Sequence, residues 1–217
     1  MKLMLKTGLI LATVFASTFI LSRIFDIISF ESIRQVLYSI QSQPDILVGG
    51  VIALLLFLDI FIAVPTLTVV LLSGYFLGFF QSILYVFPGL FAAAMTGYFI
   101  SAKWGEGMLN LIEKDPEEKI KMKKLFVHHG TTMLILSRAM PILPEITASL
   151  AGICKMPLKR FISGWFLGTI PYMLIGTYTG SISDMDNPSP AIFGAIIISG
   201  TLWLSWAYFF KKKSAQI

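Results

Sequence analysis

The chain has 217 residues, of which 56% are hydrophobic and 13% charged, and its formal net charge at pH 7 is +5. Soluble domains carry about 25% charged residues, so this composition favours an integral membrane protein with one multi-pass domain over a soluble protein. The lysines cluster at 119–124 and 211–213, which is the pattern of cytoplasmic loops, so we expect no nucleic-acid partner. The single cysteine, Cys154, excludes an internal disulfide and a cysteine-based zinc cluster.

Residues 1–45 predict an N-terminal anchor followed by an amphipathic helix. The apolar run 8–21 follows a basic start and resembles a signal peptide, but no small-residue cleavage site precedes a polar segment, so we interpret it as an uncleaved anchor. At 14 residues it is short for a span of about 20, and the sequence leaves open whether it crosses the bilayer. Apolar residues then recur at helical spacing up to Pro44, which predicts a helix lying in the membrane interface.

Residues 46–182 contain the predicted membrane domain. The apolar run 46–64 predicts a transmembrane helix that ends at Pro65. The next run, 66–80, contains Gly74 and Gly78 and is too short to cross comfortably. We therefore predict a re-entrant hairpin there, since a broken helix is tolerated at membrane depth where protein buries its backbone. A further span follows at 83–101.

The only long polar stretch, 103–130, predicts a surface helix after Pro116. Its adjacent histidines, His128 and His129, point to different helix faces, and no carboxylate or cysteine completes a ligand set, so we expect no metal site and no other cofactor.

The positive-inside rule assigns the basic segments 103–124, 155–160 and 211–213 to the cytoplasmic side, which makes the C-terminus cytoplasmic. The segment 131–153 then starts and ends on that side. It is predicted to form a second re-entrant hairpin, with its tip at Pro141 and Pro144, because proline breaks a helix.

The same reasoning leaves a conflict at the N-terminus. Working backward from the cytoplasmic segments makes Arg23 and Arg34 cytoplasmic. Lys2 and Lys6 then lie outside if the run 8–21 crosses, which violates the rule.

These segments predict an all-α fold, a polytopic membrane helical bundle with two opposed re-entrant hairpins. It comprises the anchor region 1–45, the membrane domain 46–182, and a C-terminal span with a basic tail at 183–217. Each predicted hairpin begins near a proline, Pro65 or Pro144, and reaches a glycine, Gly74 or Gly152, eight or nine residues later. This similarity indicates an inverted repeat, whose broken helices would mark a binding site near the bilayer midplane.

Three ionisable residues are predicted at membrane depth, where charge is costly and commonly functional: Asp59, Arg138 and Glu145. Arginine keeps its charge and binds phosphate in a bidentate manner, so Arg138 is the candidate ligand of an anionic headgroup. Glu145 would take up a proton or pair with Arg138 in the absence of ligand. A purely structural alternative is that Arg138 and Glu145 only neutralise each other, and that Asp59 only reaches toward the interface. No Ser–His, Asp–Asp or H-E-x-x-H arrangement lies in the spans, so we expect no enzyme.

Two stretches resemble a known family. "SGYFLGFFQSILYVFPGLFAAAMTGYFISAKWG" and "SRAMPILPEITASLAGICKMPLKRFISGWFLGTIPYMLIGTYTGS" are similar to the two signatures of the VTT domain, also called the SNARE-associated Golgi protein or DedA superfamily. The DedA branch has P-G-[DE] at the first hairpin, but this chain reads Pro65-Thr66-Leu67, so that acidic residue is missing, and the second DedA arginine falls on Pro144. Lys103 stands where many VTT members have arginine. The chain therefore resembles the VTT branch more than the DedA branch.

The resemblance implies two opposed re-entrant hairpins and the movement of phospholipids or polyprenyl-phosphate carriers between leaflets, in some members with proton coupling. Arg138 matches the arginine of the second signature, and Asp59 resembles an acidic residue ahead of the first hairpin. We therefore expect a flippase-like or scramblase-like protein of a bacterial plasma membrane, whose partners are lipids and, in a coupled mechanism, protons. The expected site comprises Arg138, Glu145, Asp59, Pro141, Pro144, Gly74, Gly78 and Gly152. The alternatives are a proton-coupled solute transporter and a non-transporting membrane organiser that acts through 103–130.

Overall fold

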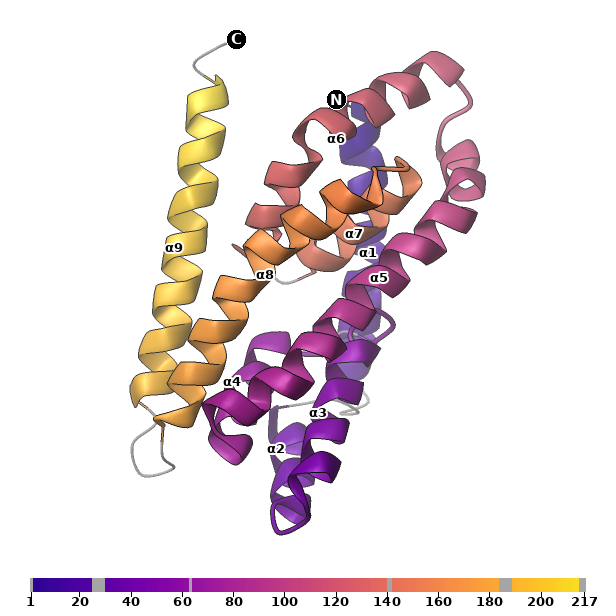
Figure 1. The fold of residues 1–217 in the computed structure, drawn as a ribbon. Helices are drawn as coiled ribbons and strands as arrows, with labels where there is room; N and C mark the ends of the chain where they lie inside the picture. The colour runs from indigo at the N-terminus through magenta and orange to yellow at the C-terminus, as the bar shows by residue number, and fades with distance from the viewer. Residues whose placement is uncertain (1, 25–29, 63, 140–141, 184–188, 215–217) are drawn as a thin grey trace.

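The computed structural model describes residues 2–24, 30–62, 64–139, 142–183 and 189–214, and these residues form helices without any strand (Figure 1). In chain order the elements are α1 (Lys2–Ile24), α2 (Phe30–Ile40), α3 (Asp45–Leu58), α4 (Thr66–Leu77), α5 (Phe79–Ile112), α6 (Pro116–Leu136), the short 3-10 helix η1 (Ser137–Ala139), α7 (Leu143–Ile153), α8 (Leu158–Ser181) and α9 (Ser189–Ser214).

Helix α5 is the longest element, with 34 residues and a length of about 51 Å. Its stretch Phe79–Gly107 is the one segment of the described chain that forms a helix both long enough and apolar enough to cross a membrane. Helices α3, α4 and α7 are apolar but contain only 14, 12 and 11 residues, so none of them reaches across a hydrocarbon core of about 30 Å.

The prediction of one helix over 46–64 is wrong, because α3 ends at Leu58. Asp59 follows, and its side chain accepts hydrogen bonds from residues 64 and 66, an arrangement that turns the chain and competes with continuation of the helix. The chain then runs back as α4. The hairpin of this half therefore consists of α3 and α4 joined at 59–65, and we call it the first hairpin.

Gly78 separates the first hairpin from α5. Its φ of 74° lies in the left-handed region, which glycine adopts without steric cost.

A second hairpin is formed by α6, η1 and α7. Asp115 caps α6, since its side chain accepts a hydrogen bond from the backbone N–H of Glu117. After η1 the chain reverses through Ile142, which adopts a positive φ of 72°, a conformation that is strained for a β-branched residue. Helix α7 then returns toward the end of the bundle where α5 meets α6 (Figure 1). There Lys155 Nζ lies 3.2 Å from Glu106 Oε2 of α5.

The two hairpins pack reciprocally on the long helices of the opposite half. A side chain at Gly74 of α4 would overlap the carbonyl oxygen of Thr177 in α8, and one at Gly152 of α7 would overlap the carbonyl oxygen of Tyr98 in α5. Tyr98 and Thr177 each stand 19 residues beyond the first residue of their helix. Such exchanged contacts are those of two units related by a pseudo-two-fold axis.

Helix α1 begins beside the junction of α5 and α6, where Lys6 Nζ donates a hydrogen bond of 2.8 Å to the carbonyl oxygen of Ile112. The helix leads to the opposite end of the bundle, where α2 and the start of α3 lie (Figure 1). The lysines near the N-terminus are therefore at the same end as the polar stretch 103–130. The prediction that these lysines lie outside came from counting 46–64 as a span. Without that span the lysines lie at the polar end, whereas α2, which carries Arg34, lies at the opposite end.

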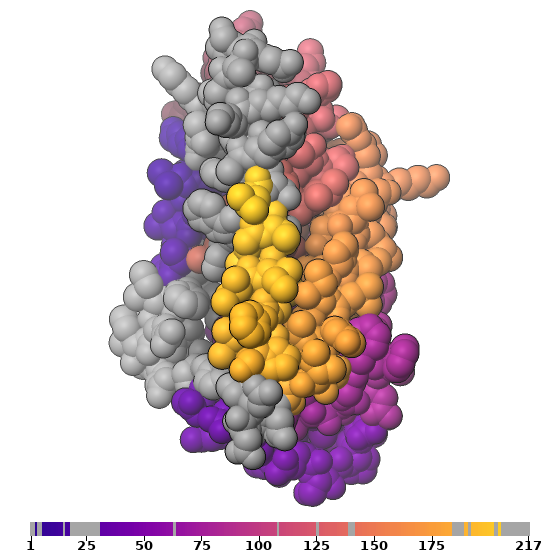
Figure 2. All heavy atoms as spheres, turned by 90° about the vertical axis from the view of Figure 1, so that its left-hand side faces the viewer, coloured from indigo at the N-terminus to yellow at the C-terminus, as the bar shows by residue number. Residues whose placement is uncertain are grey.

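The remaining helices pack on the outside of this arrangement, α2 on α4 and α9 on α8. The amphipathic α2 buries Ile33 and Leu37 in the core, while the ring of Tyr38 meets Phe76 of α4 edge-on. Figure 2 shows α9, in yellow, lying along α8, in orange. Gly194 of α9 packs on the side chain of Thr179.

Candidate functional site

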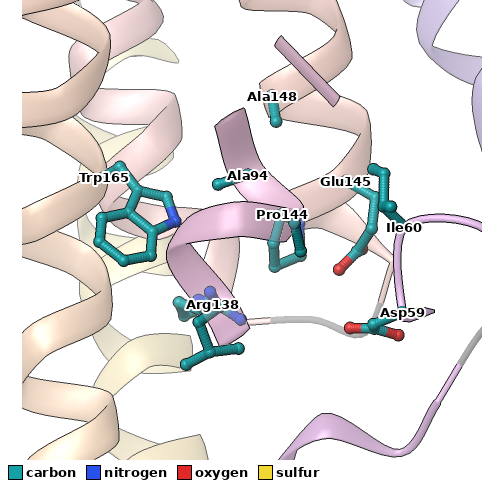
Figure 3. A pocket seen from close by; sticks show the side chains of 10 residues that line it. Asp59, Ile60, Ala94, Arg138, Pro144, Glu145, Ala148 and Trp165 are labelled. Carbon is teal, nitrogen blue, oxygen red and sulfur yellow. The ribbon is translucent and has the colours of Figure 1, made fainter. Parts of the chain in front are cut away.

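A small cavity of about 20 Å³ lies where the turns of both hairpins meet α5 and α8, and it has room for about one water molecule. Its lining includes all three charged residues that the sequence singled out, Asp59, Arg138 and Glu145 (Figure 3). The rest of the lining is apolar or aromatic: Ile60, Leu90, Ala93, Ala94, Pro144, Ala148 and Trp165.

Asp59 holds the turn of the first hairpin together. The backbone N–H of Val64 donates to its Oδ1 at 2.8 Å, and the hydroxyl of Thr66 donates to its Oδ2 at 2.6 Å. The residue is only 7% exposed, so its carboxylate is fixed inside the bundle and does not reach toward an interface.

Arg138 lies in η1 and is oriented by α8. Its Nε donates to Thr169 Oγ1 at 3.3 Å, and its guanidinium carbon lies 5.1 Å from the centre of the Tyr172 ring. Among the described residues no carboxylate oxygen lies within 4.0 Å of its nitrogens. Arg138 and Glu145 therefore do not neutralise each other through an ion pair in this structure, and the terminal N–H groups of the arginine remain available.

Glu145 stands in the first turn of α7, directly after Pro144. Its Oε2 is buried and has no hydrogen-bond partner in the part of the chain that the structure describes. In Figure 3 the carboxylates of Glu145 and Asp59 point toward each other, and Arg138 and Trp165 lie on the other side of Pro144. The cavity thus has an acidic side and a basic, aromatic side.

The two turns present charges of opposite sign at matched positions. Asp59 precedes Pro65 by six residues, and Arg138 precedes Pro144 by six; Thr66 and Glu145 directly follow these prolines. In the first hairpin the two matched side chains bind each other. In the second, the side chain of Arg138 binds α8, and Oε2 of Glu145 has no hydrogen-bond partner within the described ranges. This equal spacing is a signal that would have identified Thr66 from the sequence.

The predicted glycines do not line the cavity. Gly74 and Gly152 allow the close helix crossings, and Gly78 makes the turn before α5. Pro144 does line the cavity, whereas Pro141 lies outside the described residues.

The sequence reasoning missed Thr169, Tyr172 and Trp165. All three lie on α8, and Thr169 and Tyr172 are three residues apart, so they share a helix face. In the described chain no three histidine, cysteine, aspartate or glutamate side chains are grouped closely enough to hold a metal ion.

Comparison with known proteins places this geometry in context. The family model of the VTT domain matches residues 64–182, which include α4 to α8 and both Arg138 and Glu145. A curated protein of Caenorhabditis elegans, "Transmembrane protein 41 homolog", is 27% identical over 183 residues, which cover 81% of this chain and 74% of that protein. No solved structure matches the chain.

Proposed function

The chain belongs to the VTT-domain family of membrane proteins, and on that premise we propose that it moves lipids or lipid-phosphate carriers between the two leaflets of a bilayer. The observation that carries this proposal is the arginine at the cavity. Arg138 is held on α8, its terminal N–H groups have no partner among the described residues, and it lies beside two carboxylates in an otherwise apolar lining. Charged groups at such depth are costly and commonly mark the path of a polar substrate.

The membrane arrangement that suits this function makes both hairpins re-entrant, entering from opposite faces. The start of α1, the junction of α5 and α6, and the end of α9 gather at one end of the bundle, which carries the lysines and is the cytoplasmic end. The short helices α3, α4 and α7 then stop at depth, where α8 covers the backbone of α4 and α5 covers those of α3 and α7.

A headgroup crosses at the meeting point of the two turns. The cavity of about 20 Å³ is far smaller than a phosphate headgroup, so this structure represents a closed arrangement. Parting of the turns would let the phosphate bind the guanidinium of Arg138 as a bidentate, charge-assisted contact, while the acyl chains stay in the surrounding lipid.

The test is lipid movement in liposomes that contain only the purified chain, followed by dithionite quenching of a tail-labelled phospholipid. Arg138→Ala removes the phosphate contact and is expected to slow movement by a factor of about 10, the size of a charge-assisted hydrogen bond. Arg138→Lys keeps the charge without the bidentate geometry and serves as the matched variant. Rates equal to those of empty liposomes for the unmodified chain would refute the proposal.

A second candidate function is proton-coupled solute transport, which the unpartnered oxygen of Glu145 beside Asp59 favours. A proton carried by this carboxylate would satisfy the free oxygen. In that case Glu145→Gln abolishes pH-dependent uptake of the solute. Uptake that keeps its pH dependence in this variant argues against the candidate.

A further inference from the structure

We propose that the cavity selects phospholipids whose headgroups carry both a phosphate and a cationic amine. This inference rests on the proposed function, and it names the class of lipid that the same site would accept. Of the two kinds of cargo proposed above, this favours phospholipids over lipid-phosphate carriers, whose headgroup has phosphate alone, and it also disfavours headgroups with phosphate and an uncharged alcohol.

The charge count of the lining is the first observation. One guanidinium, that of Arg138, faces two carboxylates, those of Asp59 and Glu145, in a cavity whose other lining is apolar or aromatic. The carboxyl groups of Asp59 and Glu145 face each other, and two buried carboxylates so placed do not both ionise unless a cation joins them. A headgroup that carries an amine beside its phosphate supplies that cation, whereas a purely anionic headgroup binds the arginine but leaves the carboxyl pair without one. A headgroup with a phosphate and an amine meets the guanidinium at one end and the carboxyl groups at the other.

The separation of the charges is the second observation. The guanidinium is held against α8 by Thr169 and Tyr172, whereas Asp59 belongs to the first hairpin. The two signs therefore occupy opposite sides of the cavity (Figure 3). A phosphate on one side and an amine on the other reproduce this arrangement.

The unpartnered oxygen of Glu145 is the third observation. A buried carboxylate oxygen without a donor is unfavourable, so a ligand that supplies an N–H or a positive charge there is stabilised. Both oxygens of Asp59 already accept hydrogen bonds from within its own turn. Glu145 is thus the residue left to receive the amine, and it is the one that determines the preference.

The charges lie on separate elements, so opening of the site does not remove the selection. Arg138 is anchored to α8, Asp59 to the first hairpin and Glu145 to the start of α7. When the two turns part to admit a headgroup, Asp59 moves away from Arg138, whereas Glu145 stays on the same hairpin as Arg138, so the order of the signs across the site is kept.

The experiment measures the purified full-length chain in liposomes of equal parts phosphatidylcholine and phosphatidylglycerol. Each preparation carries a trace of one tail-labelled lipid: phosphatidylcholine, phosphatidylethanolamine, phosphatidylglycerol or phosphatidic acid. We expect the two amine lipids to cross about fivefold faster than the two others, which is the size of a partly exposed ion pair. Glu145→Gln should bring this ratio close to one by slowing the amine lipids. Glu145→Asp should restore part of the ratio.

The control is Glu117→Gln, the same change on an exposed side chain of α6, which should leave rates and ratio unchanged. A ratio near one in the unmodified chain overturns the inference while leaving lipid movement intact. A Glu145→Gln variant that slows all four lipids by the same factor also overturns it, because the residue then has only a structural or general role. Absence of movement for every lipid refutes the proposed function itself, and this inference with it.

Discussion

The guanidinium of Arg138 lies over the aromatic ring of Tyr172, with its central carbon 5.1 Å from the ring centre. Because Thr169 on the same face of α8 accepts a hydrogen bond from Nε, the arginine is held at two points. Its terminal nitrogens are the groups that form a bidentate contact with phosphate. Tyr172 and Thr169 are therefore positioning residues for the proposed headgroup contact.

Substitutions of Tyr172 distinguish its role in positioning Arg138 from the packing of its side chain in the core. Tyr172→Phe keeps the aromatic face and should move lipid at nearly the unmodified rate. Tyr172→Leu keeps an apolar side chain but loses the cation–π contact of about 0.5–2 kcal/mol, so lipid movement should fall by about 2- to 30-fold. Tail-labelled phospholipid in liposomes measures both variants, with the unfolding midpoint recorded for each. Equal rates for the two variants would show that the ring does not position Arg138.

The turn of the first hairpin should depend on Asp59. Asp59→Ala leaves the N–H of Val64 without an acceptor, at a cost of about 1–3 kcal/mol, and leaves the hydroxyl of Thr66 only its 3.4 Å contact to the carbonyl oxygen of Val64. Thr66→Val removes one partner and should cost less, whereas Thr66→Ser keeps the hydroxyl and should match the unmodified chain. Unfolding free energies in mixed micelles measure the series. If Asp59→Ala unfolds like Thr66→Ser, these hydrogen bonds do not stabilise the turn.

The two turns also explain how far the sequence could predict the fold. At the second hairpin, Pro141 and Pro144 lie inside an apolar run, and the structure ends α6 at Leu136 and begins α7 at Leu143. At the first hairpin no helix breaker precedes Pro65, so an unbroken helix over 46–64 was the reasonable prediction. The break after Leu58 instead comes from hydrogen bonds to Asp59, which depend on the path of the chain beyond Pro65.

The residues of the candidate site, like the two turns, could be predicted from the sequence only in part. Asp59, Arg138 and Glu145 could be selected because charge is rare in apolar runs, and all three line one cavity. Thr169 and Tyr172 could not, because a hydroxyl and an aromatic ring are ordinary on a helix of this kind. Their role appears only when α8 packs beside η1.

The crossing of α4 and α8 should not tolerate a side chain at Gly180. A Cβ there would overlap the backbone carbonyl of Leu71, which cannot move without shifting α4, so Gly180→Ala should lower stability by about 1–3 kcal/mol. The matched control is Gly50→Ala on α3, where no atom lies within 4 Å of the added methyl. Unfolding in mixed micelles compares the two. Equal unfolding midpoints for the two variants would mean that α4 and α8 lie further apart at Gly180 than in this structure.

The thiol of Cys154 should react slowly and with a distinctive pH dependence. The residue lies in the joint after α7, and burial raises the pKa of its thiol to about 12 from a usual value near 9. Only the thiolate reacts with maleimides, so at neutral pH labelling should be about a thousandfold slower than for an exposed cysteine. Because the pKa is raised, the rate should climb with pH throughout the range to 12. Rapid labelling at pH 7 in the folded chain, equal to that in detergent-unfolded chain, would contradict the buried position.

The final prediction concerns which helix ends share a side of the membrane. Lys6 bonds to the end of α5, so Lys6→Cys and Lys114→Cys, at the α5–α6 junction, should be labelled from one side. Gln41→Cys, just after α2, should be labelled from the other, since α1 of 23 residues spans about 35 Å. An impermeant maleimide applied to right-side-out and inverted vesicles distinguishes the sides, with the unmodified chain as the background for Cys154. Labelling of Lys6→Cys and Gln41→Cys from the same side would show that α1 does not cross. The lysines near the N-terminus would then again conflict with the charge rule.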